Sequence, residues 1–242
     1  MLDIKNKREI KVLDLSQIPQ TSNLIVERDT EYFLLEKLFK YEKEVKHKTR
    51  IVLEENSQIT YFLALFGGRR VDKEIEIVLN GKESEANILG VYFGRQDQRY
   101  CFKVVSQHNG SQTRALTWIN GVLTDKSSSD FNGLVKIVED LHQVDSHLAN
   151  HVLVFGDEAK ANAIPSLEIE SNDVKCSHEV TVGQIDENHL FYLMSRGLSK
   201  NQSERLLING FFELIISKVG NKEFKTLIRN ELHNYSMEIN EQ

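Results

Sequence analysis

The chain has 242 residues, of which 40% are hydrophobic and 27% are charged, and its formal net charge is -6 at pH 7. This composition is ordinary for a globular protein of one or two domains, and its acidic balance argues against a general nucleic-acid-binding protein. No apolar run approaches the roughly 20 residues of a membrane span, and the first residues lack the apolar core of a secretory signal. We therefore expect a cytoplasmic protein with no nucleic-acid or membrane partner.

The chain contains only two cysteines, Cys101 and Cys176. Two thiols cannot build a disulfide framework, and a chain of this length does not need one. A reducing, intracellular environment is the simpler interpretation. Cys101 lies in the strand-like segment RYCFKVV, where we expect it to be an inert, packed residue.

An internal repeat runs through the first half of the chain. One series is formed by valines spaced 26 residues apart, at Val26, Val52, Val78 and Val104. A second series is formed by phenylalanines spaced 27 residues apart, at Phe39, Phe66 and Phe93. Each unit has a β-branched run, a polar turn and a longer apolar and aromatic run, a pattern that favours strands. A strand-rich repeat of this length predicts a solenoid, best a parallel β-helix, with an antiparallel sandwich as the alternative.

Turn signals and spacing refine this expectation. The pairs Asn80-Gly81, Asn109-Gly110 and Asn120-Gly121 predict three turns. Residues 31–45 have an apolar spacing that also suits a helix, but their register with the following repeats favours a strand. Beyond Val122 the repeat loosens, with a polar loop at 126–130 and one or two strands between residues 149 and 170.

Helical periodicity replaces the strand pattern after residue 185. Asp186 is a good N-cap for a helix that ends at Gly197, and Ser199 with Gln202 forms a capping box for a second helix that stops at Gly220. A third helix is expected over residues 222–234. The expected divisions are an N-terminal segment at 1–20, a β-helix core at 21–185 and a helical domain at 186–242. We expect these helices to pack on the solenoid end, and either to cap it only or also to meet a partner.

Signatures of common enzyme classes are absent: the sequence has no phosphate-binding P-loop, no G-x-G-x-x-G and no G-x-S-x-G. A polysaccharide-acting β-helix enzyme would need a ladder of carboxylates or basic residues along one strand face, and the repeats show none. His142, His147 and His151 are best interpreted as surface residues. Within KCSHE, Cys176 and His178 lie two apart, so both point to one side of an extended strand. These are ligands for soft metals and iron–sulfur clusters, although local chemistry alone favours a packed cysteine and a satisfied histidine.

Motifs in the C-terminal third closely resemble the SufB/SufD family of iron–sulfur cluster assembly proteins. They are P-x-L-E-I at residues 165–169, DVKCSH at 173–178, TVGQID at 181–186, LFYLMSRG at 190–197, and a helix with GFF at 210–212. A weaker likeness extends over residues 100–235. CSH and TVGQID resemble the SufD branch, whereas Glu179 is closer to SufB. The family's N-terminal helical region has no counterpart here, so the resemblance is to a short, SufD-like form.

The resemblance implies a mainly β fold: a right-handed parallel β-helix core followed by a C-terminal α-helical domain. Members of the family are non-catalytic scaffold subunits that pair through their β-helix ends. The implied partner is a SufB/SufD-type paralogue or a second copy of this chain, as a homodimer. The helical domain is implied to bind a SufC-type ABC ATPase, and the candidate contact residues are Phe191, Tyr192, Ser195, Arg196, Gly197, Phe211 and Phe212.

The resemblance also implicates Cys176 and His178 in cluster assembly. It implies a transient iron–sulfur cluster at a subunit interface, and no nucleotide site on this chain. A cluster needs about four protein ligands, so one chain with these residues cannot complete the set. The alternative is a structural subunit that stabilises the ATPase complex without binding a cluster.

Overall fold

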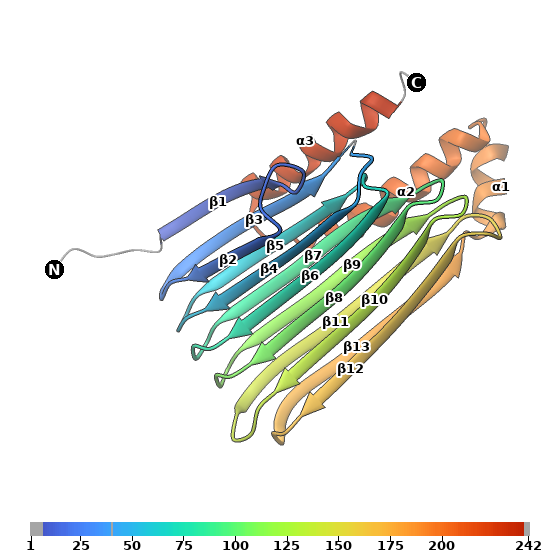
Figure 1. Cartoon of the computed structure of the whole chain (residues 1–242). Helices are drawn as coiled ribbons and strands as arrows, with labels where there is room; N and C mark the ends of the chain where they lie inside the picture. Colours follow the sequence, from blue (N-terminus) through green and yellow to red (C-terminus); the bar gives the residue numbers. More distant parts are fainter. Residues whose placement is uncertain (1–6, 40, 240–242) are drawn as a thin grey trace.

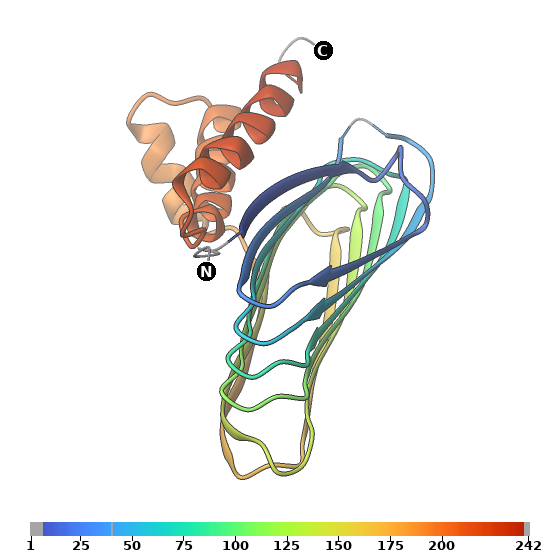
Figure 2. The same ribbon diagram turned by 90° about the vertical axis from the view of Figure 1, so that its left-hand side faces the viewer.

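The chain forms a flattened parallel solenoid with three helices along one side, in a computed structural model that describes residues 7–39 and 41–239 (Figures 1 and 2). Successive strands alternate between two sheets that face each other. The seven-stranded sheet has the order β1 (Lys7–Asp14), β3 (Thr30–Leu38), β5 (Gln58–Leu65), β7 (Glu85–Gly94), β9 (Arg114–Leu123), β11 (His142–Val154) and β13 (Asp173–Gln184). The six-stranded sheet has the order β12 (Lys160–Ile169), β10 (Ser128–Ile137), β8 (Arg99–His108), β6 (Arg70–Leu79), β4 (Val45–Leu53) and β2 (Thr21–Val26).

This architecture confirms the predicted mainly β solenoid with C-terminal helices. Every described strand pairing is parallel, so the antiparallel sandwich is wrong. From β2 onward each coil contributes one strand to each sheet. The segment at residues 31–45 contains strand β3 rather than a helix. β1 pairs with β3, so the seven-stranded sheet extends into the N-terminal segment at 1–20.

The two sequence repeats have different structural meanings. The phenylalanine series is a continuous column of contacting rings, with Phe39 edge-on to Phe66 at 5.6 Å between ring centroids and Phe66 stacked on Phe93 at 6.5 Å. The valine series holds for only one step, from Val52 to Val78, which are register partners. Beyond this step the coils change length: Val26 lies beside Leu53, and Val104 lies beside Ile75.

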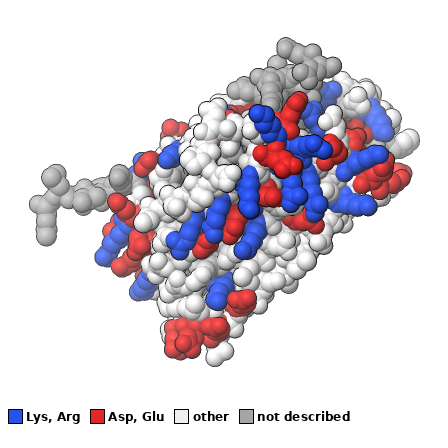
Figure 3. All heavy atoms as spheres, viewed as in Figure 1, with Lys and Arg blue, Asp and Glu red and all other residues white. Residues whose placement is uncertain are grey.

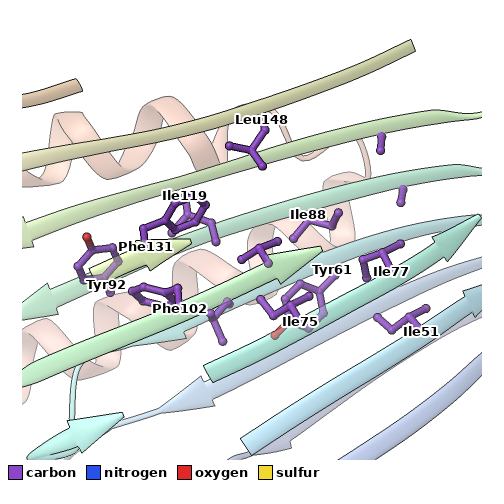
Figure 4. Close-up of a cluster of buried hydrophobic side chains, with 14 of the residues drawn as sticks. Ile51, Tyr61, Ile75, Ile77, Ile88, Tyr92, Phe102, Ile119, Phe131 and Leu148 are labelled. Atoms are coloured by element: carbon purple, nitrogen blue, oxygen red, sulfur yellow. The ribbon is translucent and has the colours of Figure 1, made fainter. Parts of the chain in front are cut away.

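Side chains that point inward from the two sheets form one continuous core (Figure 4). Burial alternates along the strands, as in β4 and β8, because successive side chains of a strand point to opposite faces. The inward residues are mostly aliphatic and aromatic, including Ile51, Tyr61, Ile75, Tyr92 and Phe102. Burial decreases at the last coil, where β12 and β13 contain no buried residue.

The predicted turn at Asn120-Gly121 is wrong, whereas the other two Asn-Gly pairs lie in turns as expected. Asn120 and Gly121 lie within β9, with Tyr92 as the register partner of Gly121. A Cβ atom added to Gly121 would overlap Cζ of the fully buried Tyr92, an impossible contact. Glycine is required at position 121 because the Tyr92 side chain occupies the space that a Cβ atom would need. An Asn-Gly pair in the sequence does not contain this information.

Gly121→Ala is therefore expected to lower the free energy of unfolding by about 1–3 kcal/mol, the usual cost of overpacking a core. Gly183→Ala is the matched control, because Gly183 is also in a strand and an added Cβ would meet nothing within 4 Å. Urea unfolding followed by circular dichroism measures both variants. Equal stability of the two would contradict this account of Gly121.

The three helices begin where the sequence predicts. α1 (Glu187–Ser195) starts after the Asp186 N-cap, α2 (Lys200–Ile216) has the Ser199–Gln202 capping box, and α3 (Lys222–Ile239) follows. α2 ends four residues before Gly220, earlier than expected. No helix among the described residues is both long and apolar enough to cross a membrane.

The expected position of the helices on the solenoid end is wrong. α2 and α3 pack instead on the outer face of the seven-stranded sheet (Figure 2). That face is apolar on β3, β5 and β7, and together with the helices it forms a second core in which Phe33 contacts Phe224 and Phe66 contacts Phe212. The helices lie there because an apolar sheet face buries more of their apolar surface than the exposed last strands can.

Candidate functional site

The last coil leaves the solenoid open at its C-terminal end. β12 and β13 are the outermost strands of their sheets, and among the described residues each pairs with a single neighbour (Figure 1). Ile164 and Ile169 on β12 and Val182 on β13 are large apolar residues exposed at this end. A hollow of about 700 Å³ lies there, with Ser129, Val154, Ala161, Val182 and Gln184 among its lining residues. Unpaired strand edges of this kind are templates for pairing with another chain.

Cys176 and His178 both lie on β13 and face the inside of the solenoid. Cys176 packs against the inner core, and its register partner is the buried Ser146. His178 is two residues further on, beside the inward-facing Leu148, and is exposed because no further coil of the described chain covers it. The structure thus places these two predicted site residues on one face, at the open end.

The backbone groups of Cys176 and His178 point to the free edge of β13. Asp145 of β11 donates its N–H group to the residue just before β9, and Phe155, just after β11, donates to the last residue of β9. The odd-numbered residues of β11 therefore bond to β9 and the even-numbered ones bond to β13. The register of β11 with β13 then leaves the even-numbered residues of β13 unpaired on the outer side. A strand added to this edge would pair directly with Cys176 and His178.

The edge of β12 is interrupted. Lys160 and Glu170 donate N–H groups toward β10, so the odd-numbered residues of β12 face outward. Pro165 is one of these outward-facing residues, and it has no backbone N–H group to donate to an added strand. A free strand edge is the place where a sheet tolerates proline. β13 therefore presents the more continuous edge of the two.

Burial raises the pKa of the Cys176 thiol above its ordinary value, and the carboxylate of Asp145 raises it further. The thiol of the isolated chain therefore stays protonated at neutral pH, so metal binding there must release a proton. Among the described residues, no group of three or more His, Cys, Asp or Glu side chains is arranged to hold a metal ion. Cys176 and His178 can supply only part of a ligand set.

The other histidines do not join this pair. His147 and His151 point outward from β11, on the opposite side of the sheet from Cys176. The Nδ1 atom of His147 lies 2.8 Å from the Ser177 hydroxyl, and the His151 ring lies 5.3 Å from the ring of Trp118. His147 keeps its interpretation as a surface histidine, whereas His151 departs from that expectation: its side chain is only 20% exposed and its Nε2 atom is buried, 3.6 Å from Glu179.

Cys101 is not a core residue, contrary to expectation. Its neighbours Tyr100 and Phe102 point inward, so Cys101 points outward from β8 and is half-buried on the outer face of the six-stranded sheet. Burial raises the pKa of its thiol. It lies beside Asp72 and Asp130 in the register, on the outer face of the other sheet and two coils before the coil of β13.

On the outer face of the six-stranded sheet, charged side chains form rows in which positive and negative groups lie side by side (Figure 3). Lys48 lies 3.0 Å from Glu74 and 2.8 Å from Glu76, and Arg50 lies 3.1 Å from Glu76. Lys103 continues the row on β8, 3.6 Å from Glu74. Because the sign of the charge alternates between β4, β6 and β8, these residues do not form an extended positively charged surface.

The residues expected to bind a partner differ in exposure. Phe191 is 73% exposed, Tyr192 is 54% exposed, and the Arg196 guanidinium lies 5.1 Å from the Tyr192 ring centre. Ser195 and Gly197 are also exposed, and α1 contains no buried residue. We use the term tail surface for Phe191, Tyr192, Ser195, Arg196 and Gly197 together with the exposed Leu206 and Leu214 of α2.

Phe211 and Phe212 do not belong to this surface. Phe211 is half-buried, and its backbone carbonyl accepts a hydrogen bond from the Asn120 side chain. Phe212 is 6% exposed and packs on Phe66, so its ring is occupied inside the monomer. A partner could reach the Phe212 ring only if α2 left the sheet.

A polar cluster lies inside the first coils that the sequence patterns did not predict. Glu36, His47 and Lys73 are buried among aliphatic residues between the two sheets. Their position in the strand pattern could have revealed them. Each lies at an inward-facing position of a strand whose other inward-facing residues are mostly apolar. Residue type alone assigns such side chains to the surface.

Residues 40–211 match the family model described as "SUF system FeS cluster assembly, SufBD core domain". The iron-sulfur cluster assembly protein SufD of Bacillus subtilis (strain 168) is 31% identical over 164 residues, which is 68% of this chain and 38% of that protein. The SufD protein of Escherichia coli (strain K12) is 29% identical over 161 residues, or 66% of this chain and 38% of that protein. An iron-sulfur cluster assembly SufBD family protein of Mycobacterium tuberculosis (strain ATCC 25618 / H37Rv) is 28% identical over 203 residues, or 81% of this chain and half of that protein.

Proposed function

The chain belongs to the SufBD core family of the SUF system for iron–sulfur cluster assembly, and from this premise we propose that it is a non-catalytic scaffold subunit of a SUF-type complex. The match confirms the resemblance found in the motifs of the C-terminal third. The matched regions of the two SufD relatives are 38% of their length, so the role of the whole assembly is part of the proposal.

The scaffold pairs through the open end of its solenoid. The exposed edge of β13 and the apolar residues Ile164, Ile169 and Val182 support this, since both features favour burial against a second chain. The partner is a SufB/SufD-type paralogue or a second copy of this chain.

A nascent iron–sulfur cluster is the cargo of this paired end. The observation that carries the proposal is that Cys176 and His178 share one face of the free strand β13. A cluster takes about four protein ligands, so the second chain must provide the others. A shared ligand set of this kind suits a cluster that is assembled and then handed on.

The tail surface binds a SufC-type ABC ATPase. Its support is the exposure of Phe191, Tyr192, Leu206 and Leu214 on two adjacent helices, because grouped exposed apolar residues mark interaction surfaces. The alternative is a structural subunit that holds the ATPase complex together and binds no cluster. The two functions differ only in whether Cys176 and His178 take part.

Anaerobic reconstitution with iron and sulfide distinguishes these functions. Visible absorption is expected to appear with the wild-type chain in complex with its SUF partners, and to be lost when Cys176→Ala and His178→Ala are combined. The physical reason is the loss of both ligands that this chain offers at the paired edge. Cys101→Ser and His147→Ala are matched controls, since they remove the same ligand types from outward-facing positions and are expected to keep the absorption.

Co-purification with the ATPase is measured on the same proteins. A chain that retains the ATPase but forms no chromophore, with or without its partners, supports the structural subunit. A chromophore that persists in the double variant removes Cys176 and His178 from the cluster site.

A further inference from the structure

A closed set of hydrogen bonds surrounds Lys73 inside the first three coils. Its ammonium group lies 2.6 Å from Glu36 Oε2, 2.6 Å from Thr49 Oγ1 and 2.8 Å from His47 Nδ1. The side chains of Lys73 and Glu36 are both 0% exposed. An ammonium group has three protons to donate, so these three acceptors use all of them.

The remaining members complete the set. The Thr49 hydroxyl donates to Glu36 Oε1 at 2.6 Å, and the Tyr61 hydroxyl donates to Glu36 Oε2 at 2.7 Å. Because Lys73 donates to His47 Nδ1, the proton of the neutral ring is on Nε2 and is directed to the Ser22 hydroxyl, 3.1 Å away. We use the term Lys73 network for Ser22, Glu36, His47, Thr49, Tyr61 and Lys73, which come from β2, β3, β4, β5 and β6.

The surroundings of this network are almost uniform. The other inward residues of β4 are Val45, Ile51 and Leu53, and those of β6 are Val71, Ile75, Ile77 and Leu79. In the observed register they stack as Val45 on Val71, Ile51 on Ile77 and Leu53 on Leu79. Figure 4 shows Ile51, Ile75 and Ile77 lying together in this part of the core.

Such an interior discriminates poorly between registers. A slip of one residue turns every side chain to the wrong face and is therefore strongly opposed. A slip of two residues keeps inward residues inward, and on β4 and β6 it stacks valine, isoleucine and leucine on one another again. Hydrophobic burial alone distinguishes little between these two arrangements.

The Lys73 network does distinguish the observed register of β4 and β6 from one slipped by two residues, because its hydrogen bonds fit only the observed one. A two-residue slip of β6 along β4 moves Lys73 by roughly 6.6 Å relative to His47 and Thr49, the rise of two strand residues. A slip in one direction sets Lys73 beside Val45, four residues from Thr49. A slip in the other direction sets it beside Thr49 and shifts it along the strands from Glu36 on β3. In each case the geometry of the three hydrogen bonds is lost for at least one acceptor, and a buried charge is left under-paired.

We propose that the Lys73 network is a register lock, which selects one of the closely similar two-residue stacking arrangements of the first coils. Its function is to specify the structure rather than to add stability. It acts on β2 to β6, at the opposite end of the solenoid from Cys176 and His178.

Removing the lock without leaving an unpaired polar group tests this proposal. The triple variant Glu36→Leu, Tyr61→Phe and Lys73→Met removes both charges and the Tyr61 hydroxyl. The Thr49 hydroxyl, 3.4 Å from His47 Nδ1, can then donate to the ring that Lys73 no longer serves. The register is measured with cysteine pairs at outward positions of β4 and β6, in a chain that carries Cys101→Ser and Cys176→Ser.

The pair Arg50→Cys with Glu76→Cys reports the observed register, because these residues are partners. The pairs Arg50→Cys with Glu74→Cys and Lys48→Cys with Glu76→Cys report the two possible slips. A thiol crosslinker that spans neighbouring strands, about 4.8 Å apart, but not diagonal positions, links each pair only in its own register.

In the otherwise wild-type chain only the first pair is expected to crosslink. In the triple variant, crosslinking of a slipped pair is expected to rise at least about tenfold, the change that 1.4 kcal/mol of lost discrimination produces. Ile51→Val with Ile77→Val is the matched control, since it alters the same strands without touching the network, and is expected to show no slip.

A folded triple variant whose slipped pairs stay at the wild-type level would overturn the proposal. Glu36→Gln with Lys73→Met is the second variant, in which the amide oxygen can accept from one of the Thr49 and Tyr61 hydroxyls and the amide NH2 can donate to the other. If neither variant folds, the proposal is also overturned, because removing a register lock leaves a core that can still collapse and fold.

Discussion

Lys73→Ala is expected to lower the free energy of unfolding by about 3–5 kcal/mol, the cost of leaving a buried charge without its partner. Burial by itself raises the pKa of the Glu36 carboxyl, but the Lys73 ammonium and the hydrogen bonds from Thr49 and Tyr61 more than offset this, so its pKa lies below the ordinary value. Without Lys73 that carboxylate must either stay charged in an apolar core or take up a proton. Urea unfolding at pH 7 measures the loss.

Lys48→Ala is the control for the Lys73 substitution. Lys48 is also a lysine paired with two glutamates, Glu74 and Glu76, but it lies on the outer face in contact with water. Exposed pairs of this kind contribute roughly 0–1 kcal/mol, so this variant is expected to stay close to the wild type. Similar losses for the two variants would contradict the buried-charge explanation.

Acidification is expected to destabilise the protein strongly between pH 7 and pH 4.5. Burial lowers the pKa of His47 to about 4, with a further contribution from the Lys73 charge, and burial lowers the pKa of His108 to about 4. An unfolded histidine titrates near 6.5, so the unfolded chain binds protons that the folded chain excludes. This contribution is fully present above pH 6.5 and is lost as the pH falls toward 4.

Each of these histidines is expected to remove about 2.5 kcal/mol of stability between pH 7 and pH 4.5, or roughly 5 kcal/mol together. The lowered pKa of Glu36 acts in the same direction, because its carboxylate must be protonated as the pH falls further. Urea unfolding at the two pH values measures the difference. His108→Gln is expected to reduce it by about half, and an unfolding midpoint independent of pH in the wild type would show that neither buried ring resists protonation.

Local sequence signals predicted the elements of this protein well. The capping residues Asp186, Ser199 and Gln202 marked the starts of α1 and α2, because they satisfy backbone N–H groups within a few residues of themselves. The phenylalanine series at Phe39 and Phe66 revealed the stacking of coils, since each coil repeats the same contact with the next.

Less of the candidate site than of the secondary structure could be predicted from the sequence. The two-residue spacing of Cys176 and His178 correctly predicts one shared strand face, because alternation is a property of the strand alone. That this face lies at a free edge, with unpaired backbone groups, follows from the absence of a further coil against β13 in the described part of the chain. No local pattern within KCSHE contains that information.

Short stretches of sequence were enough to predict the strand and helix segments, the solenoid class and the family, because these depend on local periodicity, caps and motifs. Three features became visible only in the folded chain: the sheet face that receives the helices, the reason why Gly121 must lack a side chain, and the way in which Lys73 can be buried. The physical reason is the same in each case. The outcome depends on a neighbour supplied by a distant part of the chain: the apolar outer face of β3 to β7, the ring of Tyr92, and the carboxylate of Glu36.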